Sequence, residues 1–160
     1  MPYLIESSIA LVLVIVQVLS SRLVSIGGAA PDLVVIFLAY TVITRGQLSA
    51  QIAGFVVGLL VDILSSGTLG AHALSYTLAG FLLGYFFNDE SVKQRLRNWP
   101  FLLFVFGACL ISNLVYYFFF TAGSGLNFFT YVTDHGGPGT LYTVILAVVP
   151  MYYWSRQTLY

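Results

Sequence analysis

The chain has 160 residues, of which 59% are hydrophobic and only 8% are charged. Soluble domains carry a charge at roughly a quarter of their positions, because most of their surface contacts water. Six basic and six acidic residues cannot cover a fold of this size, so the composition excludes a water-soluble monomer. The net charge of zero also argues against a nucleic-acid partner, which would require a basic surface.

Long apolar runs separated by short polar segments predict an all-α integral membrane protein. Each crossing of the bilayer needs about 20 mainly apolar residues, so the length accommodates a bundle of six transmembrane helices. We expect a single polytopic domain over residues 1–160, and the second run is short enough that its complete crossing is left open. The predicted spans are residues 3–23, 31–44, 48–64, 71–87, 99–120 and 140–155.

The basic residues predict the orientation of these spans. Loops on the cytoplasmic side of bacterial membranes carry an excess of Lys and Arg. With six spans, one side holds Arg45, Arg156 and the three basic residues of 93–97, while only Arg22 falls on the other side. Both termini are therefore expected in the cytoplasm, and the basic segment 93–97 faces anionic lipid or a cytoplasmic partner, or serves topology alone.

Small residues recur at four-residue spacing in two neighbouring spans. Ala50, Gly54 and Gly58 share one face of the third span, and Gly80 and Gly84 share one face of the fourth. Small residues let helix backbones approach closely within a membrane. These faces are predicted either to pack inside the bundle or to bind a partner helix.

A few ionisable residues are expected at the outer end of the bundle. Ionisable groups at membrane depth are rare, and they are usually paired or functional. We hypothesise that Arg22, Asp32 and Asp62 form a polar cluster that locks the first three helices together. His72 joins this end of the bundle, where a helix start suggests a capping or hydrogen-bonding role.

The sequence predicts no catalytic residue, no metal site and no cofactor. The two histidines do not have the spacing of a metal motif, and the glycines at 136–139 lack the Lys-Ser/Thr of a phosphate loop. We therefore expect a protein that is not an enzyme. The role of the outer loop 121–139, and whether a small ligand or a lipid occupies an outer pocket, are left open.

Three motifs resemble the MreD family of bacterial rod shape-determining proteins. They open the second span, run along the third, and lead into the fourth. They are Pro31-Asp32-Leu33, Gly54-x-x-x-Gly58-x-x-x-Asp62 and Ser65-Ser66-Gly67-Thr68-Leu69-Gly70-Ala71-His72-Ala73-Leu74.

The resemblance implies a non-enzymatic inner-membrane subunit of the elongasome. Such a subunit binds the transmembrane helix of MreC and acts with the MreB filament, RodA and a class B penicillin-binding transpeptidase. Its role is to organise or regulate lateral peptidoglycan synthesis and so maintain rod shape.

The family is also similar in size and helix count to the S-components of energy-coupling-factor transporters. This similarity supplies a second hypothesis, a substrate-binding subunit of a vitamin transporter. That function needs an outward-facing pocket with converging polar groups, for which Asp32, Asp62, His72 and Asn113 are candidates.

Overall fold

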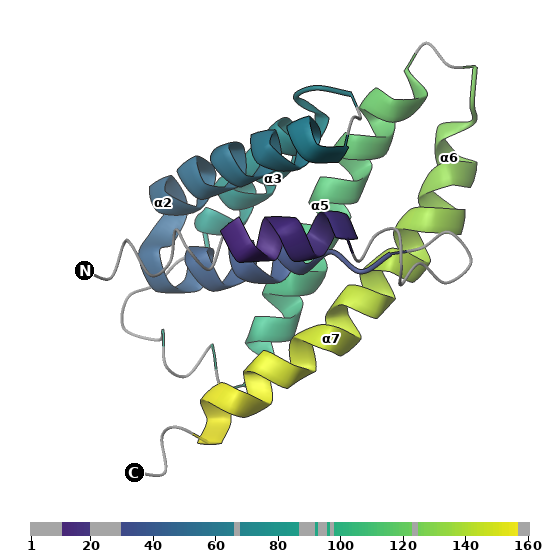
Figure 1. Ribbon diagram of the computed structural model, residues 1–160. Helices are drawn as coiled ribbons and strands as arrows, with labels where there is room; N and C mark the ends of the chain where they lie inside the picture. The colour runs from purple at the N-terminus through teal and green to yellow at the C-terminus, as the bar shows by residue number, and fades with distance from the viewer. Residues whose placement is uncertain are drawn as a thin grey trace.

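The computed structural model describes residues 11–19, 30–65, 68–86, 92, 96, 98–122 and 125–156, without the side chains of 154–156. Every element in these ranges is helical and none is a strand, which confirms the predicted all-α class for the described part of the chain (Figure 1). The N-terminal helical segment, residues 11–19, lies within the first predicted span.

Helix α2, Leu33–Ser65, contains the third predicted span and the second from residue 33 onward, and it is broken at Gly46. A straight helix of these 33 residues would be about 50 Å long, well beyond the roughly 30 Å of a hydrocarbon core. Gly46 has φ 81° and ψ −174°, a left-handed conformation that favours glycine. Figure 1 shows two arms, residues 33–45 and 47–65, meeting at a sharp bend.

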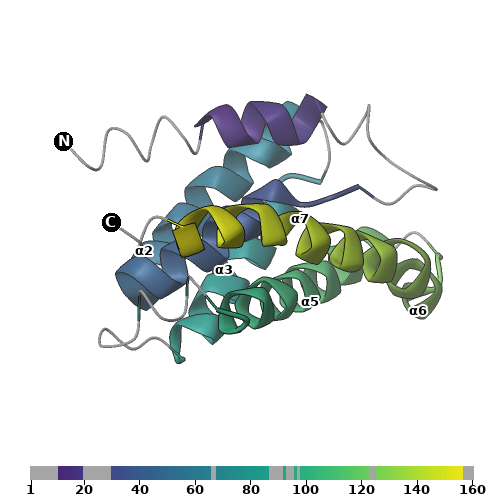
Figure 2. The same cartoon turned by 90° about the horizontal axis from the view of Figure 1, so that it is seen from below.

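The described residues form three further long helices. They are α3 (Ala71–Gly84), α5 (Pro100–Thr121) and α7 (Gly137–Arg156). α3 packs on α2 and α5, and α7 packs on α5, as the view in Figure 2 illustrates. The proline that opens α5 occupies a first-turn position, where its missing N–H costs no hydrogen bond.

Much of the segment 121–139, expected as a loop, is helical. It contains α6 (Phe128–Tyr131), the π-helical turn η2 (Val132–Gly136) and the start of α7. The Asn127 side chain accepts a hydrogen bond from the N–H of Phe129 at 3.1 Å and so starts α6. Local capping therefore produces helical turns in a stretch whose glycines and proline predict a loop.

The exposed surface is apolar, as a lipid environment requires. α2 and α5 are each long and apolar enough to cross a membrane. Large side chains such as Leu48, Leu103 and Phe118 are exposed by 71%, 53% and 61%. The interior in turn contains buried polar groups, including Ser75 and Asp62. This distribution fits a protein whose outer surface contacts lipid chains.

Candidate functional site

Asp62, near the end of α2, is a buried carboxylate with four hydrogen bonds. Its Oδ2 accepts from the N–H groups of Gly70 and Ala73, at 2.9 and 3.2 Å. Its Oδ1 accepts from the N–H of His72 at 3.1 Å and from His72 Nδ1 at 2.7 Å. The Asp62 residue is only 1% exposed, and these donors compensate for the loss of water around its charge.

The start of α3 explains why a distant carboxylate is needed there. The first turn of any helix leaves N–H groups without a partner in the helix. The N-cap position of α3 is Gly70, which has no side chain to accept them and adopts φ 91°. Asp62, which belongs to the neighbouring helix α2, caps α3 in place of a local side chain. Its negative charge also lies at the positive end of the α3 dipole.

Asp32 lies just before α2 and joins three elements. Its Oδ1 accepts from the N–H of Val35 at 3.1 Å, which caps α2. Its Oδ2 accepts from the Tyr76 hydroxyl of α3 at 2.8 Å, and its own N–H donates to Thr143 Oγ1 of α7 at 2.8 Å. The sequence pattern assigns no role to Tyr76 or to Thr143.

The two carboxylates of the predicted polar cluster therefore have different hydrogen-bond partners. His72 binds Asp62, whereas Asp32 binds Tyr76, and α3 carries both of these partners. Arg22 lies outside the described residues, so its pairing stays a prediction. The four hydrogen bonds of Asp62 use the roughly four acceptor positions of a carboxylate, while Asp32 retains acceptor capacity.

The small-residue faces of α2 and α3 lie against each other. A Cβ built on Gly54 would lie 2.7 Å from the carbonyl oxygen of Tyr76, and one on Gly58 would lie 2.5 Å from the Cα of Ala73. On the opposite helix, a Cβ on Gly80 would lie 3.0 Å from the backbone of Ala50.

Gly84 follows the same pattern at the far end of this contact, where an added Cβ would clash with the side chain of Gln47. Ala50, Gly54, Gly58, Gly80 and Gly84 are all buried. The structure thus places all five residues at the contact between α2 and α3. The backbones meet directly at Gly54, Gly58 and Gly80, whereas Gln47 packs on Gly84.

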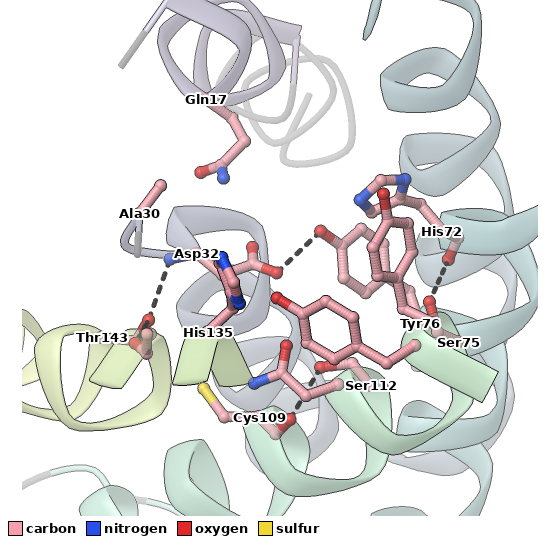
Figure 3. Close-up of a pocket in the computed structure, with 14 residues that line it drawn as sticks. Gln17, Ala30, Asp32, His72, Ser75, Tyr76, Cys109, Ser112, His135 and Thr143 are labelled. Carbon is pink, nitrogen blue, oxygen red and sulfur yellow. Dashed lines mark hydrogen bonds between the residues drawn. The ribbon is translucent and has the colours of Figure 1, made fainter. Parts of the chain in front are cut away.

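A partly open cavity of about 190 Å³ lies beside Asp32 (Figure 3). It is bounded by the N-terminal helical segment 11–19, the residues just before α2, and α3, α5, η2 and α7. It includes three of the four residues expected in an outer pocket, Asp32, His72 and Asn113, but not Asp62. The full lining is Gln17, Ala30, Asp32, His72, Ser75, Tyr76, Cys109, Ser112, Asn113, Tyr116, Tyr117, His135, Gly139 and Thr143.

Aromatic rings and α5 polar groups shape this cavity. The His72 ring lies 4.3 Å from the ring of Tyr116, measured between centroids, and Tyr116 lies 5.3 Å from Tyr117. Asn113 Nδ2 donates to the carbonyl of Gly136 at 3.3 Å and thereby ties α5 to η2. Nothing in the sequence pattern predicts this last contact, because it depends on the π-helical turn.

His135 of η2 contributes a ring to the cavity and is held by stacking. Its centroid lies 5.1 Å from that of Tyr131, with the planes 14° apart. Its Nδ1 is buried and has no hydrogen-bond partner within the described part of the chain. Over those same ranges, no group of three or more His, Cys, Asp or Glu residues is placed to hold a metal ion.

Comparison with known proteins gives a family match over nearly the whole length. No curated protein and no solved structure matches the chain at the threshold of the comparison, so the expected similarity to S-components stays a prediction. The family model described as rod shape-determining protein MreD matches residues 1–159. With its apolar surface and its membrane-length helices, this chain belongs to the MreD family of rod shape-determining membrane proteins.

Proposed function

We propose that the protein is a non-enzymatic, multi-pass subunit of the bacterial inner membrane that binds the transmembrane helix of MreC. In this role it helps to organise or regulate lateral peptidoglycan synthesis, together with RodA, a class B penicillin-binding transpeptidase and the MreB filament. Family membership supports the proposal, because the family belongs to the MreBCD rod-shape system. Both termini are proposed to lie in the cytoplasm.

The observation that carries the proposal is the closed contact between α2 and α3. Since Gly54, Gly58 and Gly80 are buried there, a partner helix must use the exposed apolar faces. Several exposed apolar faces follow helical spacing, and two of them lie on the membrane-length helices α2 and α5. They are Leu48, Ile52, Phe55, Leu59 and Ile63 on α2, and Leu103, Phe106, Leu110, Leu114 and Phe118 on α5.

Photo-crosslinking in living cells tests the partner and the face together. A photoreactive amino acid at Phe55 or Leu110, one on each face, is expected to capture MreC from one of the two positions. Asp134, which is exposed on η2 and belongs to neither face, is the comparison position. Absence of an MreC adduct from both faces, combined with unchanged rod shape on depletion of the protein, would contradict the proposal.

Orientation depends on whether the arms of α2 cross separately. We propose that they do, with the bend at Gly46 and the adjacent Arg45 on the cytoplasmic side. Reporter fusions after Arg45 and after Ser65 should then report opposite compartments. The same compartment from both fusions would refute six crossings.

The presence of a cavity is the observation that supports an alternative function, a substrate-binding subunit of a vitamin transporter. Its volume of about 190 Å³ is below the roughly 300–1,000 Å³ of sites for drug-sized ligands, so the rod-shape role is better supported. Affinity purification from native membranes separates the two functions. Retention of MreC supports the first, and retention of ATPase subunits with a bound vitamin would overturn it.

A further inference from the structure

Most polar hydrogens around the cavity are already committed to the protein itself. The hydroxyls of Ser75, Ser112 and Thr143 each donate to a carbonyl three or four residues earlier, at 2.8, 3.2 and 2.8 Å. The amide of Asn113 donates to Gly136 O and Thr140 Oγ1, at 3.3 and 3.0 Å. These groups therefore have few donors left to offer to a bound molecule.

Acceptors, by contrast, remain available. The Asp32 carboxylate accepts from the Tyr76 hydroxyl and from the N–H of Val35, and the N–H of Val34 also contacts it. Among the described residues these donors leave at least one of its roughly four acceptor positions for a ligand. His135 Nδ1 is buried without a hydrogen-bond partner within the described ranges. A buried nitrogen of this kind is costly unless another molecule satisfies it. His135 Nδ1 can accept or donate, depending on the tautomer of the ring. The Asp32 carboxylate, which can only accept, therefore suits a ligand that donates hydrogen bonds.

Charge and aromatic rings narrow the ligand class further. Asp32 supplies a carboxylate, and among the described residues the lining contains neither Lys nor Arg. Tyr76 of α3 and Tyr116 and Tyr117 of α5 also line the cavity, and the ring of His72 packs on Tyr116. A cation placed over such rings is attracted by their π-electrons, and an ammonium group can also donate hydrogen bonds to the carboxylate.

We propose that this cavity binds a compact ammonium group, either of a free amine or of an ethanolamine phospholipid headgroup. The volume of about 190 Å³ is slightly larger than a cavity of about 150 Å³ that accommodates benzene, so a short aminoalkyl group fits. Lipid chains would remain outside, against the apolar surface. The proposal concerns the purified protein alone and is independent of MreC binding.

Calorimetric titration of the full-length protein in detergent with ethanolamine tests the proposal. Ethylene glycol is the matched neutral ligand, because it replaces the ammonium by a hydroxyl. Asp32→Asn should weaken ethanolamine binding at least tenfold, whereas Asp134→Asn, on the exposed face of η2, should leave it unchanged. If Asp32→Asn does not fold, Tyr116→Leu replaces it and should weaken binding severalfold through loss of a ring.

Native mass spectrometry distinguishes the two sources of the ammonium. Co-purified phosphatidylethanolamine that is lost in Asp32→Asn identifies the headgroup, and ethanolamine binding without this lipid identifies the free amine. Equal binding of ethanolamine and ethylene glycol, or equal affinity in the two Asp→Asn variants, would overturn the proposal. Ethanolamine binding that emerges only in Arg22→Gln would also overturn it, because the chain's own guanidinium would then fill the cavity.

Discussion

Replacing Asp62 by Ala should destabilise the protein more than any other single loss of charge among the described residues. The change removes the acceptor for three backbone N–H groups at the start of α3 and for the ring of His72. Loss of a helix cap alone costs about 1 kcal/mol, and each buried donor left unsatisfied costs about 1–3 kcal/mol. Because part of α3 can relax or admit water, we expect a total near 3–5 kcal/mol, as for a broken buried charge pair.

Denaturant unfolding in detergent, followed by circular dichroism, measures this loss. Asp134→Ala is the matched control, since Asp134 is exposed, and it should change the free energy of unfolding by less than about 0.5 kcal/mol. A value for Asp62→Ala as small as the control would refute the capping argument. A double-mutant cycle with Arg22→Gln should give a coupling below about 0.5 kcal/mol, because Asp62 has no acceptor position left for a guanidinium.

Three further substitutions test the packing, the Asp32 junction and the bend. Gly58→Ala should cost about 1–3 kcal/mol of unfolding free energy by forcing a methyl group into the backbone of α3, while Gly137→Ala, at an exposed position, should cost far less. Tyr76→Phe should cost about 1.5–3 kcal/mol through loss of a hydrogen bond to a carboxylate, and the effect should shrink when Asp32 is already Asn. Gly46→Ala should cost about 1–2 kcal/mol because its φ of 81° is strained for alanine, and an unchanged melting temperature would contradict the assigned bend.

Sequence periodicity captures the features that depend on regular helices. Four-residue spacing identifies Ala50, Gly54 and Gly58 as one face and predicts that Asp62 lies at its end. The short polar segment after Asp62 predicts a hairpin, which brings His72 near that carboxylate. These deductions need only a helix and a turn, and both are encoded locally.

Contacts between distant elements could not be predicted in the same way. The capping of α3 by Asp62 involves backbone N–H groups. Almost every residue has such a group, so no sequence motif indicates which of them are capped. The bonds of Asp32 to Tyr76 and Thr143 depend on the angles between α2, α3 and α7, which composition and spacing do not determine. The helical turns of 128–139 likewise depend on capping by Asn127 and on support from neighbouring helices.

The backbone contact between α2 and α3 has a mechanical consequence. Side-chain contacts can adjust by exchanging rotamers, but backbones that touch at Gly54 and Gly58 have no such freedom. Residues 47–65 of α2 should therefore move together with α3 as one rigid unit. A displacement that a neighbouring protein imposes on the exposed side of this unit would therefore be transmitted to the start of α3. It would also shift Tyr76, its partner Asp32 and the wall of the cavity.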